Sequence, residues 1–446
     1  MRTIDPCRKR IRLSLIPFSV GIVQIERIRL AMDLGPYHWI FYQHDDQMND
    51  IPLTLARQPI MTKDGRVLGY ELLYRGSAIG DSAAATVKSA RVLCEALSTP
   101  GLDGLTGDAH MFVNFGQALL TTDVPLLLPA GRGVVEIIED VEPTPTILET
   151  LDKVRHAGVG IALDDFQFQK PLIPLLAYAN FVKVDILQSA HELDKLVERL
   201  KTYQVPMIAE KVETHEELQR CWDLGFQLFQ GYFFARPEPM QAKSIGSSQM
   251  TLVSLIMDLQ NPDLEAEELA QVIGRDLGLT HRILKLSNSA AYRRKRPVAS
   301  IADAVVLLGR DTVSQWASLL VMTQLADRKP LELFALALIR GRLCQVLGAA
   351  KHQFAAGELY TVGLLSVLDA LLDRPMKTLV NELPLAVSLR DALCGISSPL
   401  RDVLQKAIAY ETADWGALGE LTVDEEARLA AAYAGATRFS HLALGQ

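Results

Sequence analysis

Six short apolar runs of this sequence each end in a carboxylate or amide side chain. These side chains are Glu71, Asn114, Glu136, Asp164 with Asp165, Glu210 and Gln230. Strands that are buried on both faces and end in polar residues are typical of the active-site face of a (β/α)8 barrel. Carboxylate and amide oxygens are the ligands that magnesium and manganese prefer, so neither His nor Cys is required. The residue types therefore indicate divalent-metal chemistry on a phosphate.

The adjacent pair Asp164 and Asp165 carries the most information. Neighbouring strand residues point to opposite faces, so both carboxylates reach one site only where the backbone turns at a strand end. Two cations about 3.5 to 4 Å apart can serve the attacking and the leaving oxygen of a phosphodiester. A lone carboxylate at a strand end is more often a helix N-cap or a solvated loop residue. The ordered series is what favours a metal site.

Short apolar runs alternate with amphipathic runs from residue 54 onward, which predicts repeated βα units and a closed barrel. The expected strands are residues 53–59, 69–73, 111–115, 134–138, 159–163, 181–185, 206–209 and 227–230. The expected helices between them are residues 82–97, 144–156, 191–203 and 214–224. No Gly-rich phosphate loop follows the first strand, which argues against an open doubly wound sheet. Asp64 and Gly65 predict a hairpin at the start of the barrel.

The sequence changes character at residues 237–248, which we interpret as a linker after a barrel of residues 48–236. Beyond the linker, helical periodicity dominates and predicts an all-α domain of residues 249–446. Its expected helices include residues 254–259, 264–273, 279–287, 301–308, 313–325 and 422–434. Residues 1–47 form an irregular, Arg-rich leader, and Met48 is the alternative start of the chain.

Composition limits the class of protein. A chain of 446 residues is too long for one ordinary core, so two domains are expected. The formal net charge of -8 argues against a general nucleic-acid-binding surface. Five scattered cysteines without CxxC spacing indicate a reduced, cytoplasmic protein. No apolar run approaches the roughly 20 residues of a membrane span, so no membrane partner is expected.

Seven motifs, in this order along the chain, resemble those of the EAL domain. That family is a TIM-like barrel that hydrolyses the bacterial second messenger cyclic di-GMP to linear pGpG. The motifs are YELLYR with Glu71 and Arg75, VNF with Asn114, VEIIED with Glu136 and Glu139, ALDDF with Asp164 and Asp165, VKVD with Lys183 and Asp185, AEKVET with Glu210 and Glu213, and FQGYFFARP with Gln230.

The resemblance implies two ions, Mg2+ or Mn2+, with cyclic di-GMP as the ligand. The implied ligands of the first ion are Glu71, Asn114, Glu136 and Asp164. Asp164 or Asp165 is shared with the second ion. The implied catalytic residues are Lys183, which positions or polarises the attacking water, together with Glu210 and Asp165.

The remaining motif residues have supporting roles by the same resemblance. Gln230 supports metal and water from across the barrel mouth, together with Glu210. Glu139 holds the loop after its strand, and Arg75 contacts a substrate phosphate. Asp185 and Glu213 complete the supporting set. EAL-type barrels often dimerise, so the resemblance also implies a homodimer.

Two positions and one segment depart from the family pattern. Leu72 replaces the alanine of the motif that names the family, and Lys211 stands where relatives have glycine. The segment QFQKPLIPL follows Phe166 in place of a glycine-rich continuation. In active relatives this loop couples metal binding, substrate binding and dimerisation. Its replacement weakens the case for efficient catalysis.

The helical half resembles an HDOD domain, and the whole chain resembles a divergent subgroup in which an EAL barrel is fused to that domain. HDOD domains resemble HD phosphohydrolases but lack their metal ligands, and here Ser366 and Val367 stand where His-Asp would be. Without those ligands no dinuclear site assembles. We therefore expect the helical domain to regulate the barrel or to bind an unidentified protein partner.

Two functional classes stay open from the sequence. In the first, the barrel is a metal-dependent cyclic di-GMP phosphodiesterase that the HDOD domain regulates. In the second, the barrel is catalytically weak or inactive, and the chain is a cyclic di-GMP sensor or a protein-interaction scaffold.

Overall fold

The computed structural model describes residues 55–74, 105–237, 247–261, 263–288, 298–326, 329–349 and 354–444. The leader of residues 1–47, Met48, Arg75 and the expected helix of residues 82–97 lie outside the described residues. The boundaries of the two domains and of the linker stay predictions.

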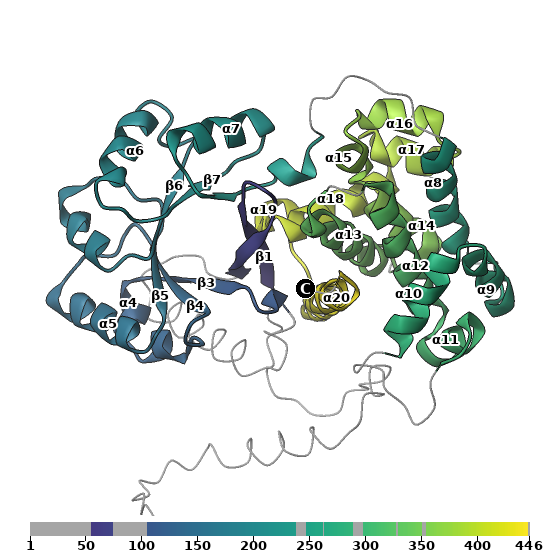
Figure 1. Ribbon diagram of the computed structural model, residues 1–446, viewed down its shortest axis with the longest axis horizontal. Coiled ribbons are helices and arrows are strands. Elements are labelled where there is room, and N and C mark those ends of the chain that lie inside the picture. The colour runs from purple at the N-terminus through teal and green to yellow at the C-terminus, as the bar shows by residue number, and fades with distance from the viewer. Residues whose placement is uncertain are drawn as a thin grey trace, which may run out of the picture. The chain divides into compact units, whose positions relative to one another are not determined.

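Eight strands close into a barrel in the order of the sequence (Figure 1). They are β1 (Leu55–Thr62), β2 (Val67–Tyr74), β3 (His110–Phe115), β4 (Gly133–Ile137), β5 (Gly160–Leu163), β6 (Phe181–Asp185), β7 (Met207–Glu210) and β8 (Leu228–Gln230). Each expected strand is present, with ends within three residues of those predicted. The predicted fold class, a TIM-like barrel followed by an all-α domain, is confirmed.

The first strand gives the barrel its irregular feature. β1 pairs antiparallel with both β2 and β8, whereas the strands from β2 to β8 pair in parallel. Gly65 has a φ of 80° in the turn between β1 and β2, and its amide donates to the carbonyl of Thr62 at 3.0 Å. The predicted hairpin is therefore confirmed, and glycine supplies the left-handed conformation that the turn needs.

Helices of the barrel follow the strands as expected. They are α4 (Gln117–Leu120), α5 (Pro145–His156), α6 (Leu193–Lys201) and α7 (His215–Leu224), with 3-10 segments η1 (Val124–Leu127), η2 (Lys170–Ala177) and η3 (Phe233–Ala235). The Thr144 hydroxyl caps α5 by accepting from the amide of Ile147. A capping box of Thr214 and Glu217 begins α7. Local sequence signals thus fix where these helices start.

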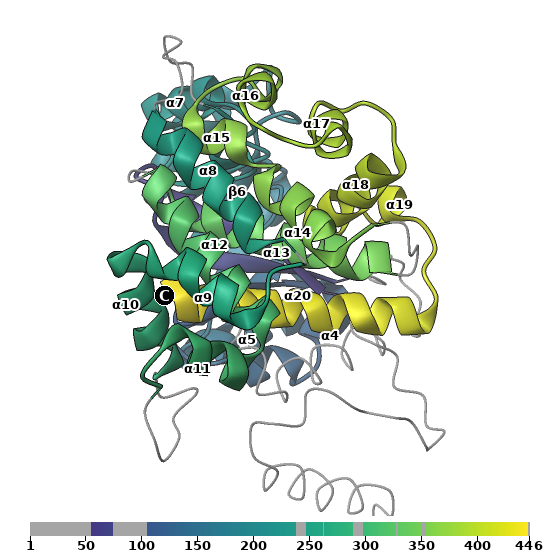
Figure 2. The same ribbon diagram turned by 90° about the vertical axis from the view of Figure 1, so that its right-hand side faces the viewer.

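The described part of the second half is entirely helical. Its helices are α8 (Ser247–Leu259), α9 (Ala266–Gly274), α10 (Leu277–Ser287), α11 (Ile301–Leu308), α12 (Arg310–Leu325), α13 (Leu331–Ala349), α14 (Ala356–Leu365), α15 (Leu368–Leu372), α16 (Met376–Glu382), α17 (Val387–Leu393), α18 (Pro399–Glu411), α19 (Trp415–Leu418) and α20 (Val423–Leu444). The last helix lies along this domain (Figure 2). It continues ten residues beyond the predicted end at Ala434. Gly435 faces open space and does not end the helix, and the next residue, Ala436, is again buried in the core. None of the helices in the described segments is long and apolar enough to cross a membrane.

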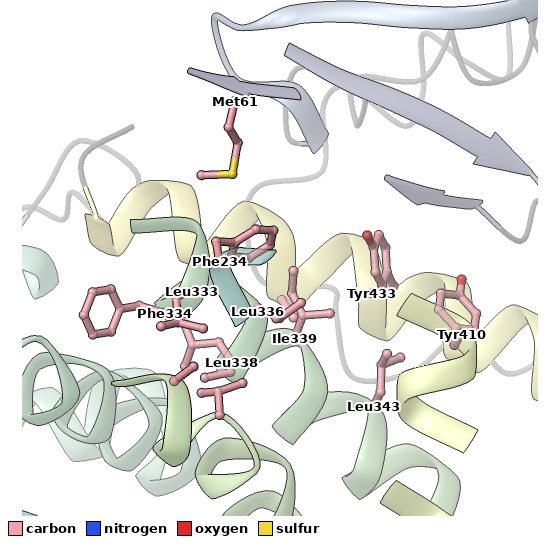
Figure 3. Packing of buried hydrophobic residues seen from close by; sticks show 14 of the residues in the cluster. Met61, Phe234, Leu333, Phe334, Leu336, Leu338, Ile339, Leu343, Tyr410 and Tyr433 are labelled. Atoms are coloured by element: carbon pink, nitrogen blue, oxygen red, sulfur yellow. The ribbon is translucent and has the colours of Figure 1, made fainter. Parts of the chain in front are cut away.

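One hydrophobic cluster includes buried residues of both the barrel and the helical domain. Met61 of β1 and Phe234 of η3 belong to it, together with Leu333 and Leu336 of α13 and Tyr433 of α20 (Figure 3). Met61 and Leu333 are both fully buried. The helical domain therefore packs against β1 and against the segment that follows β8.

Candidate active site

The polar residues at the strand ends lie at one end of the barrel. Strand register pairs Asn114 with Glu136 across β3 and β4, and Asp185 with Glu210 across β6 and β7. The carboxyl ends of parallel strands meet at the same edge, so these side chains converge there. The same register logic brings Gln58 of β1 opposite Glu71 of β2.

The Lys183 ammonium lies at the centre of four carboxylates. Its Nζ is 2.5 Å from Glu136 Oε1, 2.8 Å from Glu210 Oε1, 2.9 Å from Glu71 Oε2 and 3.2 Å from Asp164 Oδ1. The side chain of Lys183 is only 1% exposed. Burial alone would lower the pKa of Lys183, but the surrounding carboxylates raise it well above its ordinary value. The ammonium therefore stays charged and offsets part of the negative charge around it.

The carboxylates of this cluster respond differently to burial. Burial raises the pKa of Glu136 well above its ordinary value, and the charge of Glu71 raises it further. Burial raises the pKa of Glu210 to about 8 despite the opposing effect of Lys183. Burial alone would also raise the pKa of Glu71, but the charge of Lys183 and the hydrogen bonds from Lys183 and two amides outweigh burial and lower this pKa. Without a further cation, Glu136 and Glu210 therefore hold protons more readily than free carboxylic acids do, because one ammonium does not compensate all the carboxylates.

Two amide side chains orient Glu71. Asn114 Nδ2 donates to Glu71 Oε1 at 2.7 Å, and Gln230 Nε2 donates to Glu71 Oε2 at 2.6 Å. Gln230 Nε2 also donates to Gln58 Oε1 at 3.0 Å. Sequence reasoning missed Gln58, although its alternation with Arg57 in the first strand was a usable signal.

Buried oxygens without hydrogen-bond partners remain in this cluster. Among the described residues, Glu136 Oε2, Asn114 Oδ1 and Gln230 Oε1 have none. Unpaired buried oxygens are costly, and carboxylate and amide oxygens are the donors that hard divalent cations take. The donor set therefore fits Mg2+ or Mn2+.

The backbone turns at the paired aspartates as the sequence predicts. Asp165 has a φ of 41°. On either side of it, the amide of Asp164 donates to the carbonyl of Ile137, and the amide of Phe166 donates to the carbonyl of Lys183. As a result, Asp164, Asp165 and Glu210 offer carboxylate oxygens that all lie within 4.8 Å of one another. Burial, together with the charge of Asp164, raises the pKa of Asp165. The three carboxylates can share one metal ion.

Lys211 has a role that the sequence did not reveal. It adopts a φ of 59°, in the region that glycine favours, and its Nζ forms an ion pair with Asp185 Oδ2. Asp185 Oδ1 accepts from the amides of Leu187 and Gln188, at 2.8 and 3.1 Å. Burial would raise the pKa of Asp185, but the hydrogen bonds, with that of Lys211 the largest, lower it. Asp185 thus holds the turn after β6 to the turn after β7.

Gly231 fixes the end of β8. Its φ is 144°, and a Cβ added to it would lie 2.1 Å from the carbonyl oxygen of Val212. The amide of Val212 donates to the carbonyl of Gln230 at 3.0 Å. Only glycine permits this approach of the two segments, which sets the position of Gln230.

The loop after Asp165, which departs from the family pattern in sequence, packs against the barrel. Phe166 is buried and meets the ring of Phe168 edge-on at 5.3 Å between centroids. The Arg199 guanidinium lies 3.9 Å from the centre of the Phe168 ring. The segment continues as η2, in which Leu175 and Leu176 are buried.

Two predicted supporting residues lie outside the carboxylate cluster. Glu139 is exposed in the turn after β4, and within the described segments no hydrogen bond or ion pair links it to the cluster. Glu213 is exposed and lies 3.4 Å from Arg236 in a surface ion pair. The position of Arg75 falls outside the described residues.

In the helical domain, the two residues that replace His-Asp have other partners. Val367 is buried in the core. Ser366 Oγ accepts from Arg340 Nη1 at 2.8 Å. Arg340 also forms a bidentate pair with Glu411, at 2.9 and 2.7 Å. A guanidinium therefore contacts the position that a metal ligand would occupy in an HD enzyme.

Comparison with known proteins decides the family. A family model described as the EAL domain matches residues 115–237, and one described as the HDOD domain matches residues 246–382. The cyclic di-GMP phosphodiesterase CdgJ of Vibrio cholerae serotype O1 is 32% identical over 370 residues, which cover 81% of this chain and 85% of that protein. The chain belongs to the EAL–HDOD family.

Other relatives are similar to this EAL–HDOD chain over different lengths. The uncharacterized protein YuxH of Bacillus subtilis is 30% identical over 383 residues, covering 82% of this chain and 92% of that protein. The solved calcium and cyclic di-GMP complex of Klebsiella pneumoniae BlrP1 is 22% identical, with a TM-score of 0.35, and the match covers 44% of this chain and 58% of that one. The resemblance stated from the motifs is confirmed at the level of family and domain order.

Proposed function

We propose that this EAL–HDOD chain hydrolyses cyclic di-GMP to linear pGpG with two divalent cations, Mg2+ or Mn2+, at the carboxylate cluster around Lys183. The observation that carries the proposal is the excess of buried acidic groups over cations. Four carboxylates contact one ammonium, Asp165 lies beside two of them, and three buried oxygens lack partners within the described segments. The name of the relative CdgJ supports the same substrate.

The proposed ligands of the first ion are Glu71, Asn114, Glu136 and Asp164, which lie together around Lys183 and Glu71. Asp164 and Asp165 would extend the set to the second ion, with Glu210 beside them. When bound, the two ions activate a water molecule and stabilise charge on both the attacking and leaving oxygens.

The chain's own residues supply orientation and charge. Lys183 balances the carboxylates and would position or polarise the attacking water. Gln230 and Asn114 hold Glu71 through both of its oxygens. Asp185 and Lys211 tie together two turns beside the mouth. Contact of Arg75 with a substrate phosphate, and the supporting roles of Glu139 and Glu213, stay part of the proposal.

The HDOD domain is the proposed regulatory or interaction module for an unidentified protein partner. The contact of Ser366 with Arg340 supports a role other than metal catalysis. A cytoplasmic location and a homodimer through the barrel are further parts of the proposal, and the dispersed cysteines support the former.

A second candidate function is a cyclic di-GMP sensor or scaffold with weak or no turnover. Two features favour it, the altered loop after Phe166 and the lysine at position 211. Both flank the proposed metal site without removing a ligand. Binding with no hydrolysis would therefore point to this alternative.

Product analysis tests the proposal. Purified full-length chain is incubated with cyclic di-GMP and Mg2+ or Mn2+, and pGpG is quantified by chromatography. We expect Glu71→Gln to lower turnover on the order of 100-fold or more, since it replaces a charged carboxylate ligand by a neutral amide. Glu198→Gln, in an exposed pair with Lys201, is the matched control and should keep wild-type turnover. Absence of pGpG with either metal would overturn the proposal.

A further inference from the structure

A buried polar cluster joins the barrel to the helical domain. It consists of Arg57 of β1, Tyr70 of β2, Glu332 of α13 and Tyr433 and His441 of α20, hereafter the interdomain polar cluster. Arg57 Nη2 lies 3.2 Å from Glu332 Oε1, and Tyr70 Oη donates to Glu332 Oε2 at 2.9 Å. One carboxylate of the helical domain thus binds two adjacent barrel strands.

Arg57 has partners in both the barrel and the helical domain. Its guanidinium lies 3.9 Å above the centre of the Tyr70 ring, and its Nη1 lies 2.6 Å from His441 Nε2 and also donates to the Leu105 carbonyl. The backbone amide of Arg57 donates to Tyr433 Oη at 3.0 Å. Arg57 and Glu332 are each 3% exposed. Replacement of a whole buried ion pair by apolar residues is often neutral, whereas removal of one partner costs about 3 to 5 kcal/mol.

The opposite face of the same hairpin carries the proposed active site. Adjacent residues of a strand point to opposite faces, so Tyr70 meets the helical domain while Glu71 meets Lys183. In β1 the same alternation separates Arg57 from Gln58, which pairs in register with Glu71. A movement of the hairpin together with α13 would therefore displace Glu71 from Lys183.

A second contact holds the strand that completes this arrangement. Tyr232, two residues after Gln230, donates from its hydroxyl to the carbonyl of Glu411 at 3.1 Å. Gln230 donates to Glu71 at 2.6 Å. The strand that carries Glu71 and the segment that follows Gln230 are therefore both bound to the helical domain through polar groups.

We propose that Glu332 is a positioning residue for Glu71, so that docking of the HDOD domain on the β1–β2 hairpin completes the metal site of the barrel. The carboxylate of Glu332 holds Tyr70 and Arg57, and through them the strand that presents Glu71. A partner that moves α13 would change metal binding without touching the barrel mouth. The link to metal rests on the proposed function, whereas the link between Glu332 and the strand does not.

The test compares two buried tyrosines in the full-length chain. Tyr70→Phe removes only the hydroxyl that Glu332 binds. Tyr360→Phe is the matched control, because Tyr360 is 1% exposed in α14 and its hydroxyl has no hydrogen-bond partner among the described residues. The two readouts are hydrogen exchange of peptides that cover residues 67–74 and 228–233, and Mn2+ affinity measured by electron paramagnetic resonance.

We expect Tyr70→Phe to speed exchange in both peptides and to weaken Mn2+ binding, each roughly 2- to 30-fold. Peptides of β5 and β6 should exchange as in the wild type, and Tyr360→Phe should change neither readout. Glu332→Gln, which keeps the shape of the side chain and removes its charge, should repeat the pattern. A merely structural contact would lower the melting temperature and leave Mn2+ affinity unchanged.

The outcomes separate this inference from the proposed function. If the variants leave both peptides and Mn2+ affinity at wild-type values, the positioning role is wrong. If the wild-type chain takes up no Mn2+, the proposed function is wrong, and exchange in the two peptides alone decides the coupling. Unchanged exchange would then overturn it.

Discussion

Replacement of Lys183 by methionine tests whether the ammonium or a metal ion balances the carboxylate cluster. Methionine keeps an unbranched side chain of similar length and removes the charge. Four carboxylate oxygens lie between 2.5 and 3.2 Å from Nζ and would lose their common partner. Removal of one partner from a buried ion pair costs about 3 to 5 kcal/mol. For a domain of barrel size, each kcal/mol lowers the melting temperature by about 2 to 4 °C, so we expect a loss on the order of 10 °C in EDTA.

Mn2+ should reverse part of this loss. A ligand at about 100 times its dissociation constant stabilises the folded state by about 2.7 kcal/mol. Lys183→Met leaves the site more negative, so Mn2+ should raise its melting temperature more than that of the wild type, while pGpG formation falls. Lys201→Met, in an exposed pair with Glu198, is the control and should change stability by less than about 1 kcal/mol. Equal stability of Lys183→Met and wild type in EDTA would refute the reasoning, as would Mn2+ stabilising neither.

Chemical denaturation checks three further predictions. Gly231→Ala should destabilise the chain by more than about 3 kcal/mol, because the added Cβ would meet the Val212 carbonyl. The control is Gly131→Ala, at a φ of 79° with open space around it, which should cost only about 1 to 2 kcal/mol. Lys211→Gly should change stability by less than about 1 kcal/mol, since relief of the left-handed backbone strain offsets the loss of the ion pair with Asp185. A larger loss of stability would mean that the ion pair contributes more than the backbone strain costs. Burial, together with the charge of Arg57, lowers the pKa of His441 to about 4. The imidazole therefore binds a proton more tightly in the unfolded state than in the folded state. Stability consequently falls as the pH drops from about 6.5 toward 4. Between pH 7.5 and 5.5 this loss should be about 1 kcal/mol, and it should vanish in His441→Gln.

The sequence predicted the barrel well because its strands are buried on both faces. Such strands appear as continuous apolar runs, and the polar residue at the end of each run marks its carboxyl end. Asp64 and Gly65 predicted the hairpin through turn chemistry that acts over four residues. The convergence of Asp164, Asp165 and Glu210 followed from the same local rule at a strand end.

What the sequence did not reveal depends on contacts between distant residues. Arg57 and Glu332 are separated by 275 positions, and each alone is typical of a surface charge. Lys211 stood out only as a departure from glycine, because its pair with Asp185 forms only once two strand ends are adjacent. The full length of α20 depends on its packing against α13, and the residues around Gly435 give no local signal of that packing.

Binding and turnover measured on one preparation test the central claim most directly. The full-length chain is titrated with cyclic di-GMP in Mg2+ and in Mn2+, and pGpG is quantified in the same samples. The proposed function predicts binding in both, with pGpG formed in at least one of them and turnover of Glu71→Gln on the order of 100-fold lower. Binding without pGpG would show a sensor, and neither binding nor pGpG would contradict the assignment of the carboxylate cluster to cyclic di-GMP.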